Sequence, residues 1–342
     1  MRLRIFGGVG LLAAAALLSG CDSQPTTVKL ADTKADAAAR LKASQAAKIK
    51  LAAQVKANEL GQIPVLMFHR VVDKPATTDD RSPQQFRADL ERLVREGYVP
   101  ITAAEMVAGK IDIPAGKHPV VLTFDDSSPS QLTLNEVGVP APNTAVAILK
   151  DVAAKHPGFP AKATFFVTRD MFGKTVREEQ AQMLGWLKDN GFEIGNHTRD
   201  HVNLRGRSHK EVDEQISTIA QQIDSLSGVH PTTIALPYGN QPSNKEWAMH
   251  GKAYKHQGVF LAGYTPAPAP FSKAFEPEGI PRIKVMEKKG DCKQFCSEAW
   301  LDWLKNNPDM RYTSDGDVRT VAYPKFKNPY LRKSFSKWGL PY

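Results

Sequence analysis

The chain has 342 residues, which is enough for one large domain or two of ordinary size. Hydrophobic residues make up 42% and charged residues 24%, so a sizeable core can form and the composition excludes a wholly disordered protein. The net charge of +9 favours anionic surroundings such as phospholipid headgroups or an acidic polymer. No run of Arg and Lys has interleaved aromatic residues, so we expect no nucleic acid partner.

The first 20 residues have the parts of a secretory signal peptide. Arg2 and Arg4 precede an apolar run at 5–18, which is short for a membrane span. The run ends in the sequence LSGC at 18–21, which resembles the bacterial lipobox. That resemblance implies cleavage before Cys21 and attachment of lipid to its sulfur, with an ordinary signal peptide and an incidental cysteine as the alternative.

Residues 21–60 are rich in Ala and Lys and lack aromatic side chains. Many of them are strong helix formers, so we expect a partly helical tether between membrane and domain. A short coiled-coil stalk is the alternative, although Ala stands where Leu or Ile would line its seam.

From residue 61 the pattern changes to strands and helices in alternation. Short apolar runs predict the strands, and N-capping residues and glycines mark the ends of the helices. The elements predicted in chain order are strand 65–68, helix 82–97, strand 120–124, helix 143–156, strand 163–167, helix 177–190, strand 192–195, helix 208–227, strand 232–236, strand 257–263 and strand 280–285. This alternation predicts a parallel α/β sheet, open or closed into a barrel, whose reactive groups collect at the carboxyl ends of the strands.

Three of these strands run directly into polar residues. The residues concerned are Asp125 and Asp126 after strand 120–124, His197 and His201 after strand 192–195, and Tyr238 after strand 232–236. Neighbouring side chains of a strand alternate in direction, so only one of the two carboxylates is expected to bind a metal. Two histidines four residues apart lie on one face of a helical turn, and with one carboxylate they form a three-ligand set. The second carboxylate is then available as a general base for metal-activated water.

Together these motifs resemble those of the polysaccharide deacetylases with a NodB-like domain, carbohydrate esterase family 4. The sequence TFDD at 123–126 resembles the first family motif, HTRDH at 197–201 the second, and LPYG at 236–239 the end of the third. Upstream, VLMFHRV at 65–71 looks like the opening strand of the branch that includes poly-β-1,6-N-acetylglucosamine deacetylases. The resemblance covers roughly residues 63–285.

The resemblance implies a distorted (β/α)7 barrel that removes N- or O-acetyl groups from sugars. Carried onto this sequence, it implies Asp125 as the catalytic base and Asp126, His197 and His201 as ligands of a divalent metal. Zinc is favoured by histidine ligation, with Co, Ni, Mn or Fe as alternatives. The backbone N–H of Tyr238 is implied to help hold the oxyanion.

The sequence departs from the family pattern at two catalytic positions. Ala235 stands where the family has an Arg that orients the catalytic Asp; Arg282 is our candidate to replace it from across the barrel, and a surface arginine is the alternative. The late motif with a catalytic His is missing at 283–285. We therefore take His69 as the candidate general acid, with a structural His at the barrel rim as the alternative. Residues 129–142 form an insertion beside the base, either a lid or a passive loop.

Cys292 and Cys296 remain as an even pair in an exported protein, which favours a local disulfide over two free buried thiols. Two cysteines alone do not make a structural zinc site. They lie in a segment with no family counterpart, in which Trp300 and Trp303 have the helical spacing more typical of a packing face than of a sugar platform.

The sequence thus predicts a lipoprotein signal peptide at 1–20, a tether at 21–60, a deacetylase domain at 61–286 and a C-terminal extension at 287–342 that packs on the barrel. We expect a monomer, anchored by lipid in the cell envelope and facing the periplasm or cell exterior. Its expected partner is an acetylated envelope or extracellular polysaccharide, from which it removes acetyl groups. The alternatives are a glycan-binding module without turnover and a metal-dependent amidase acting on a non-sugar substrate.

Overall fold

The computed structural model describes residues 34–290 and 292–342. The predicted signal peptide, Cys21 and the first part of the predicted tether lie outside the described residues. Within the described part, no helix combines the length and apolar character that crossing a lipid bilayer requires.

Helix α1 (Lys34–Gln54) is the first described element. The chain divides into two compact units after Ser44, so the last turns of α1 belong to the second unit, Gln45–Tyr342. In that unit Ala52 and Ala57 are fully buried against Ala322 and Leu340. The folded unit therefore begins before residue 60, where the sequence placed the end of the tether.

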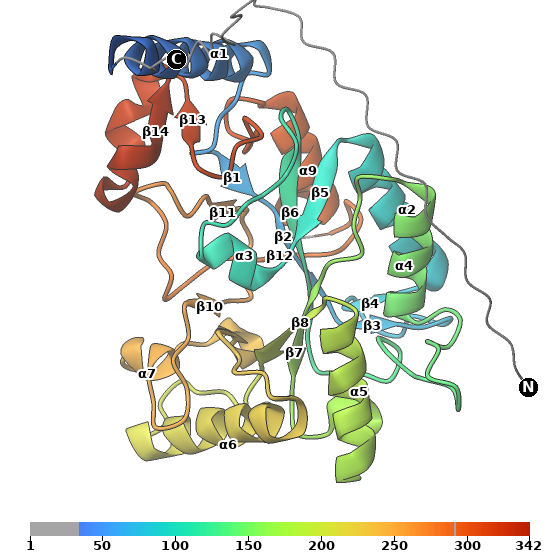
Figure 1. Ribbon diagram of the computed structural model, residues 1–342. Helices are drawn as coiled ribbons and strands as arrows, with labels where there is room; N and C mark the ends of the chain where they lie inside the picture. The colour runs from blue at the N-terminus through green and yellow to red at the C-terminus, as the bar shows by residue number, and fades with distance from the viewer. Residues whose placement is uncertain (1–33, 291) are drawn as a thin grey trace, which may run out of the picture. The chain divides into compact units, whose positions relative to one another are not determined.

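A curled sheet of parallel strands forms the centre of the second unit, in the order β10-β9-β8-β7-β6-β2-β12 (Figure 1). The strands are β2 (Val65–Phe68), β6 (His118–Phe124), β7 (Thr164–Val167), β8 (Glu193–Asn196), β9 (Thr233–Ala235), β10 (Gly258–Phe260) and β12 (Ile283–Lys284). A parallel bridge between Phe260 and Ile280 links β10 to the segment entering β12, so the two ends of the row meet. The predicted distorted α/β barrel is confirmed.

Strand β5 (Tyr98–Ile101) and helix α3 (Ala103–Val107) were not predicted. β5 and β7 pair with the same edge of β6. β5 pairs with the first half of β6, and β7 pairs with its second half. Two short two-stranded sheets flank the barrel. They pair β1 (Gln62–Ile63) with β11 (Ala267–Pro268), and β3 (Arg70–Val71) with β4 (Asp80–Arg81).

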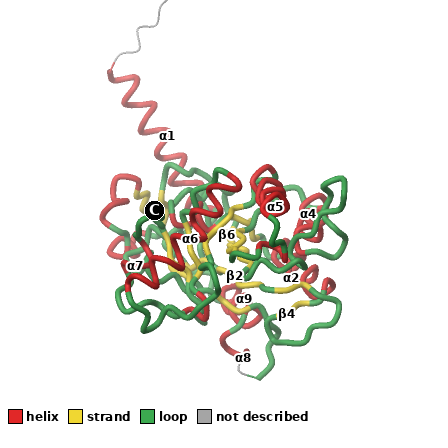
Figure 2. Tube along the Cα trace, turned by 90° about the horizontal axis from the view of Figure 1, so that it is seen from below, coloured by secondary structure: helices red, strands yellow, loops and turns green. Residues whose placement is uncertain are grey.

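The helices lie around the strands (Figure 2). They are α2 (Pro83–Arg95), α4 (Ala145–Lys155), α5 (Arg177–Asp189), α6 (His209–Ser227), α7 (Glu246–Met249), α8 (Cys292–Phe295) and α9 (Ser297–Asn306). Their ends follow local chemistry: Ser82 and Gln85 form a capping box at the start of α2. Gly228 ends α6 in the left-handed conformation, φ 67°, which glycine adopts without steric cost.

Alternation along each strand separates two cores. Phe124 and Phe165 stack at 4.9 Å between the sheet and helices α2, α4 and α5. Phe166, next to Phe165, points to the opposite side and meets Phe260 inside the barrel. The same alternation directs Asp125, which follows Phe124, towards the barrel interior.

Residues after α9 complete the second unit. Strand β13 (Val321–Tyr323) pairs with β14 (Gly339–Pro341), and two 3₁₀ helices, Lys325–Tyr330 and Lys333–Trp338, lie between them. Tyr312, Val321 and Tyr323 are buried in the cluster that contains Ile63 and Val65 of the barrel. This segment covers the end of the barrel at which the strands begin.

Candidate metal and catalytic site

The register of the sheet brings the predicted site residues to one edge. Phe68 pairs with Phe124, and Val167 pairs with Asn196, so these strands end at matching levels. His69, Asp125 and His197 directly follow them.

Asp125 and Asp126 face different surroundings, as strand alternation predicts. Asp125 is 2% exposed and points into the barrel. The backbone then turns through left-handed conformations at Asp126 (φ 71°) and Ser127 (φ 46°), which are uncommon for residues with a side chain. This turn leaves the Asp126 side chain 43% exposed at the rim of the barrel.

His197 is fixed in one tautomer. Its Nδ1 donates to the Ala235 carbonyl of β9 at 2.8 Å, because a carbonyl oxygen can only accept. Its Nε2 therefore carries the lone pair, is buried, and has no hydrogen-bond partner. A ligand-ready imidazole oriented by a backbone carbonyl is typical of metal sites.

The segment from His197 to His201 is not the helical turn that the spacing predicted. It is an irregular bend in which Thr198 (φ 62°) and His201 (φ 50°) are left-handed. The Asn196 side chain accepts from the backbone N–H of Thr198 at 2.9 Å and so stabilises this bend. The prediction of a helix was wrong, yet the bend brings the two imidazole centroids to 5.0 Å.

Three potential ligand atoms converge at this point. The Nε2 atoms of His197 and His201 each lie 3.3 Å from Oδ1 of Asp126. All three atoms lie within 4.8 Å of one another. A buried, unpartnered imidazole nitrogen beside a carboxylate oxygen and a second imidazole fits a divalent metal ion.

Asp125 forms a bidentate pair with Arg282. Nη1 and Nη2 of Arg282 donate to the two carboxylate oxygens at 2.7 and 2.6 Å. The guanidinium also donates to Thr123 Oγ1 and the Leu261 carbonyl, and Arg282 is 0% exposed. The alternative of a surface arginine is therefore wrong, and a guanidinium reaches Asp125 although position 235 is Ala.

The pair determines the charge of Asp125. Burial alone would raise the pKa of its carboxyl, but the positive charge and the hydrogen bonds of Arg282 outweigh burial and hold that pKa below its usual range. Asp125 is therefore ionised, with its Oδ2 3.9 Å from Nε2 of His197.

The other two predicted catalytic residues lie at the same edge. His69 is half-buried directly after β2. Tyr238 has a left-handed backbone, φ 58°, in the 3₁₀ turn Pro237–Gly239, and its exposed ring contacts His201 at 4.9 Å.

Gln131 is a site residue that the sequence did not reveal. Its Nε2 donates to the carbonyls of His69 and Asp125 at 2.8 and 2.5 Å, and the residue is fully buried. Gln131 thereby ties the beginning of the 129–142 insertion to two strand ends. The tip of that insertion is exposed at Val137 and Val139.

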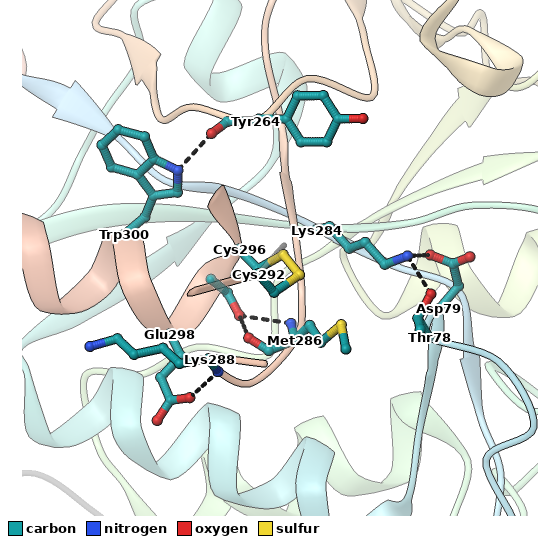
Figure 3. Close-up of a disulfide and its surroundings, with 11 residues drawn as sticks. Thr78, Asp79, Tyr264, Lys284, Met286, Lys288, Cys292, Cys296, Glu298 and Trp300 are labelled. Carbon is teal, nitrogen blue, oxygen red and sulfur yellow. Dashed lines mark hydrogen bonds and ion pairs between the residues drawn. A yellow bond between two sulfur atoms is a disulfide. The ribbon is translucent and has the colours of Figure 1, made fainter. Parts of the chain in front are cut away.

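Cys292 and Cys296 are joined by a disulfide beside the end of β12 (Figure 3). The hydroxyl of Ser297, the next residue, accepts from the backbone N–H of Met286 at 3.1 Å. This hydrogen bond connects the segment that follows β12 to the start of α9, and the disulfide closes the short loop between them.

The fold and the donor set define a class: a parallel α/β barrel with an Asp-His-His cluster and a buried carboxylate at its carboxyl edge. Residues 112–256 match the family model described as polysaccharide deacetylase. The chain carries a polysaccharide deacetylase domain of the NodB-like type.

Two curated relatives show how far the likeness extends. The Bacillus cereus peptidoglycan-N-acetylglucosamine deacetylase is 28% identical over 167 residues, which are 48% of this chain and 53% of that protein. The Bacillus subtilis peptidoglycan-N-acetylmuramic acid deacetylase PdaC is 35% identical over 120 residues, 35% of this chain and 21% of that protein. The match spans about half of the first relative and a fifth of the second.

Among solved structures, the Streptococcus pyogenes deacetylase PplD in complex with acetate has a TM-score of 0.53 and 22% identity. The match covers 70% of this chain and 97% of PplD. This likeness is one of fold. Which branch of the family lies nearest stays a prediction.

Proposed function

We propose that this chain is a metal-dependent hydrolase that removes acetyl groups from N-acetylated sugars of an envelope or extracellular polysaccharide. The observation that carries the proposal is the Asp126, His197 and His201 donor set beside the buried Asp125–Arg282 pair. The curated relatives, whose names specify peptidoglycan sugars, support the substrate class.

Asp126, His197 and His201 are the residues that would hold the ion. Two imidazoles and one carboxylate suit zinc best, and Co, Ni, Mn and Fe are also compatible with this set. Such an ion, when bound, lowers the pKa of a coordinated water and polarises the carbonyl of the substrate.

Asp125 serves as the general base in this proposal. Arg282 occupies one lone pair on each carboxylate oxygen, which orients the group and leaves further lone pairs to accept the proton of the attacking water. The water oxygen bonds to the acetyl carbon, and the C–N bond then breaks. His69 donates the proton that the leaving amine requires, and the backbone N–H of Tyr238 stabilises the oxyanion.

The cellular setting is part of the proposal. An N-terminal signal with the LSGC sequence supports a lipid anchor at Cys21, in the cell envelope and facing the periplasm or exterior. We propose a monomer whose contact with the membrane is through that lipid.

Acetate release from an N-acetylated chitooligosaccharide tests the function. We expect release that a chelator abolishes and a divalent metal restores, and a loss of about 100-fold or more in Asp125→Asn, since general base catalysis contributes on that order. Release that is indifferent to metal, or unchanged in Asp125→Asn, would contradict the proposal.

The binding-only alternative is weakened by one contact. It rested partly on the Ala at position 235, but Arg282 supplies a guanidinium to Asp125. The amidase alternative is tested by adding small amides and peptides to the same assay. Cleavage of those with sugars inert would favour it.

A further inference from the structure

A large cavity lies beside the end of β12, and its lining includes none of the three residues of the metal cluster. The disulfide and several other lining residues are drawn in Figure 3. Its volume is about 920 Å³, within the range of ligand pockets in proteins. Three aromatic rings line it, those of Tyr264, Phe295 and Trp300, and the polar groups of Thr78, Lys284 and Lys289 lie among them.

The cavity is built from segments on the carboxyl side of the barrel strands, the side that carries the metal cluster. Its walls come from segments that leave the carboxyl ends of three strands: Thr78 after β2, Tyr264 after β10, and Lys289 after β12. Arg282, which holds Asp125, lies two residues before Lys284 and donates to the Leu261 carbonyl, three residues before Tyr264. The same two segments therefore support the catalytic pair and line the cavity.

Fixed contacts hold the walls of this cavity. Trp300 Nε1 donates to the backbone carbonyl of Tyr264 at 2.6 Å. Lys284 Nζ lies 2.7 Å from both Thr78 Oγ1 and Asp79 Oδ1. The Cys292–Cys296 disulfide encloses the segment that carries Phe295.

The rings are nevertheless left uncovered. Tyr264 is 64% exposed and Phe295 is 47% exposed, and they meet edge to face at 6.3 Å. Exposed aromatic groups gathered at one cavity mark a binding site more often than a packing defect. Lys289 is one of the residues that line the cavity, so its ammonium can donate to a ligand oxygen there.

We propose that this cavity binds a second sugar ring of the polymer while the acetylated sugar occupies the catalytic site. The inference rests on the proposed function. The C–H face of a pyranose ring packs on aromatic rings, and its hydroxyl or acetamido oxygens can accept from Lys289 and Thr78. The cavity would then give the chain a preference for oligomers over single sugars.

Ring-deletion variants test the inference in the whole chain. Tyr264→Ala removes the ring but keeps the carbonyl that accepts from Trp300, and Phe295→Ala removes the second ring. The matched controls are Tyr330→Ala and Phe326→Ala, whose rings are 62% and 71% exposed on the C-terminal segment. Substrates are an N-acetylated chitopentaose and an aryl acetate too small to reach the cavity.

We expect KM for the pentasaccharide to rise about tenfold in Tyr264→Ala and in Phe295→Ala, since one aromatic contact contributes on that order. We expect kcat, turnover of the aryl acetate, and both controls to match the wild type. Tyr264→Phe should restore KM, because the stacking face returns. Equal losses on both substrates, or pentasaccharide kinetics like those of the controls, would overturn the inference.

Binding without turnover separates this inference from the proposed function. Calorimetric titration of chitopentaose into Asp125→Asn, with and without Tyr264→Ala, should show about tenfold weaker affinity when the ring is absent. If neither the wild type nor any variant releases acetate but the affinity for chitopentaose still falls in Tyr264→Ala, the proposed activity is wrong and the inference about the cavity is supported. If acetate is released and the affinities are equal, the cavity inference fails alone.

Discussion

Asp125 and Arg282 are 157 positions apart in sequence, and they form the bidentate ion pair at the centre of the site, with both residues buried. Asp125 enters the barrel from the end of β6, and Arg282 enters from the segment just before β12. Their contact joins the predicted base to the last strand of the barrel. Several expected outcomes depend on this pair and on the groups around it.

Replacing Arg282 with Leu should destabilise the chain by about 3–5 kcal/mol, because removing one partner leaves a buried carboxylate uncompensated. Arg282→Lys keeps the charge but loses the bidentate geometry, so acetate release should fall more than stability does. Urea unfolding and acetate release measure the two effects. Arg319→Lys, at a side chain 78% exposed, is the control. Wild-type stability in Arg282→Leu would exclude a structural role for the pair.

The metal cluster should bind one divalent ion per chain, measured by elemental analysis after dialysis. His197→Ala should lose that ion, because it removes the ligand nitrogen of the cluster that is buried and unpartnered. Added zinc should raise the melting temperature of the wild type, since a ligand at a thousandfold excess over its Kd stabilises by about 4 kcal/mol. His250→Ala, at a ring 52% exposed, should keep both properties. Equal metal content in the two variants would disprove the assignment.

Gln131→Ala should lower kcat for acetate release by about tenfold, because two carbonyls lose their common donor and the strand ends bearing His69 and Asp125 shift. Stability should fall by about 1–3 kcal/mol, as two buried acceptors lose a partner. Gln84→Ala, on the exposed face of α2, should change neither quantity. An unchanged kcat with lowered stability would show that Gln131 stabilises the fold but does not position the catalytic residues.

Glu59 should make the stability depend on pH. Burial first, and the nearby charge of Asp315 second, raise the pKa of its carboxyl to about 8 from its usual value of 4.5. The folded state therefore keeps a proton that the unfolded chain releases above pH 4.5. The free energy of unfolding should fall as pH rises from about 4.5 to 8, by at most about 1.4 kcal/mol per pH unit.

Glu59→Gln removes this contribution, so its unfolding free energy should depend less on pH than that of the wild type across this window. Urea unfolding at pH 5, 6, 7 and 8 measures the difference between the two chains. The exposed Glu276→Gln should follow the wild type. Parallel curves for wild type and Glu59→Gln would contradict the prediction.

The sequence determined the elements whose signals are local. Buried strands such as Thr164–Val167 are short apolar runs, and helices such as His209–Ser227 begin at a capping serine and end at a glycine. Their alternation predicted a parallel α/β sheet, open or closed into a barrel, and the family resemblance implied the barrel. The polar residues after the strands indicated the candidate ligands. These inferences succeed because hydrophobic periodicity and capping chemistry act over a few neighbouring residues.

Other features of the site depended on contacts between distant segments. The bend at His197–His201 replaces the expected helical turn because Asn196 and the Ala235 carbonyl stabilise it. Gln131 gave no signal, because its role depends on two strand ends that the sheet register brings together. Likewise, the sequence placed Ala52 and Ala57 in the tether. Their buried contacts with Ala322 and Leu340 place them in the folded unit.

The sequence by itself thus determined the order of the strands along the chain and the identity of Asp125, Asp126, His197 and His201 as candidate reactive groups. Only the tertiary structure decided that Arg282 reaches Asp125 and that Tyr264 and Phe295 share one cavity. The physical reason is that side-chain alternation fixes a direction within one strand, whereas the closure of the barrel fixes which distant strand lies opposite.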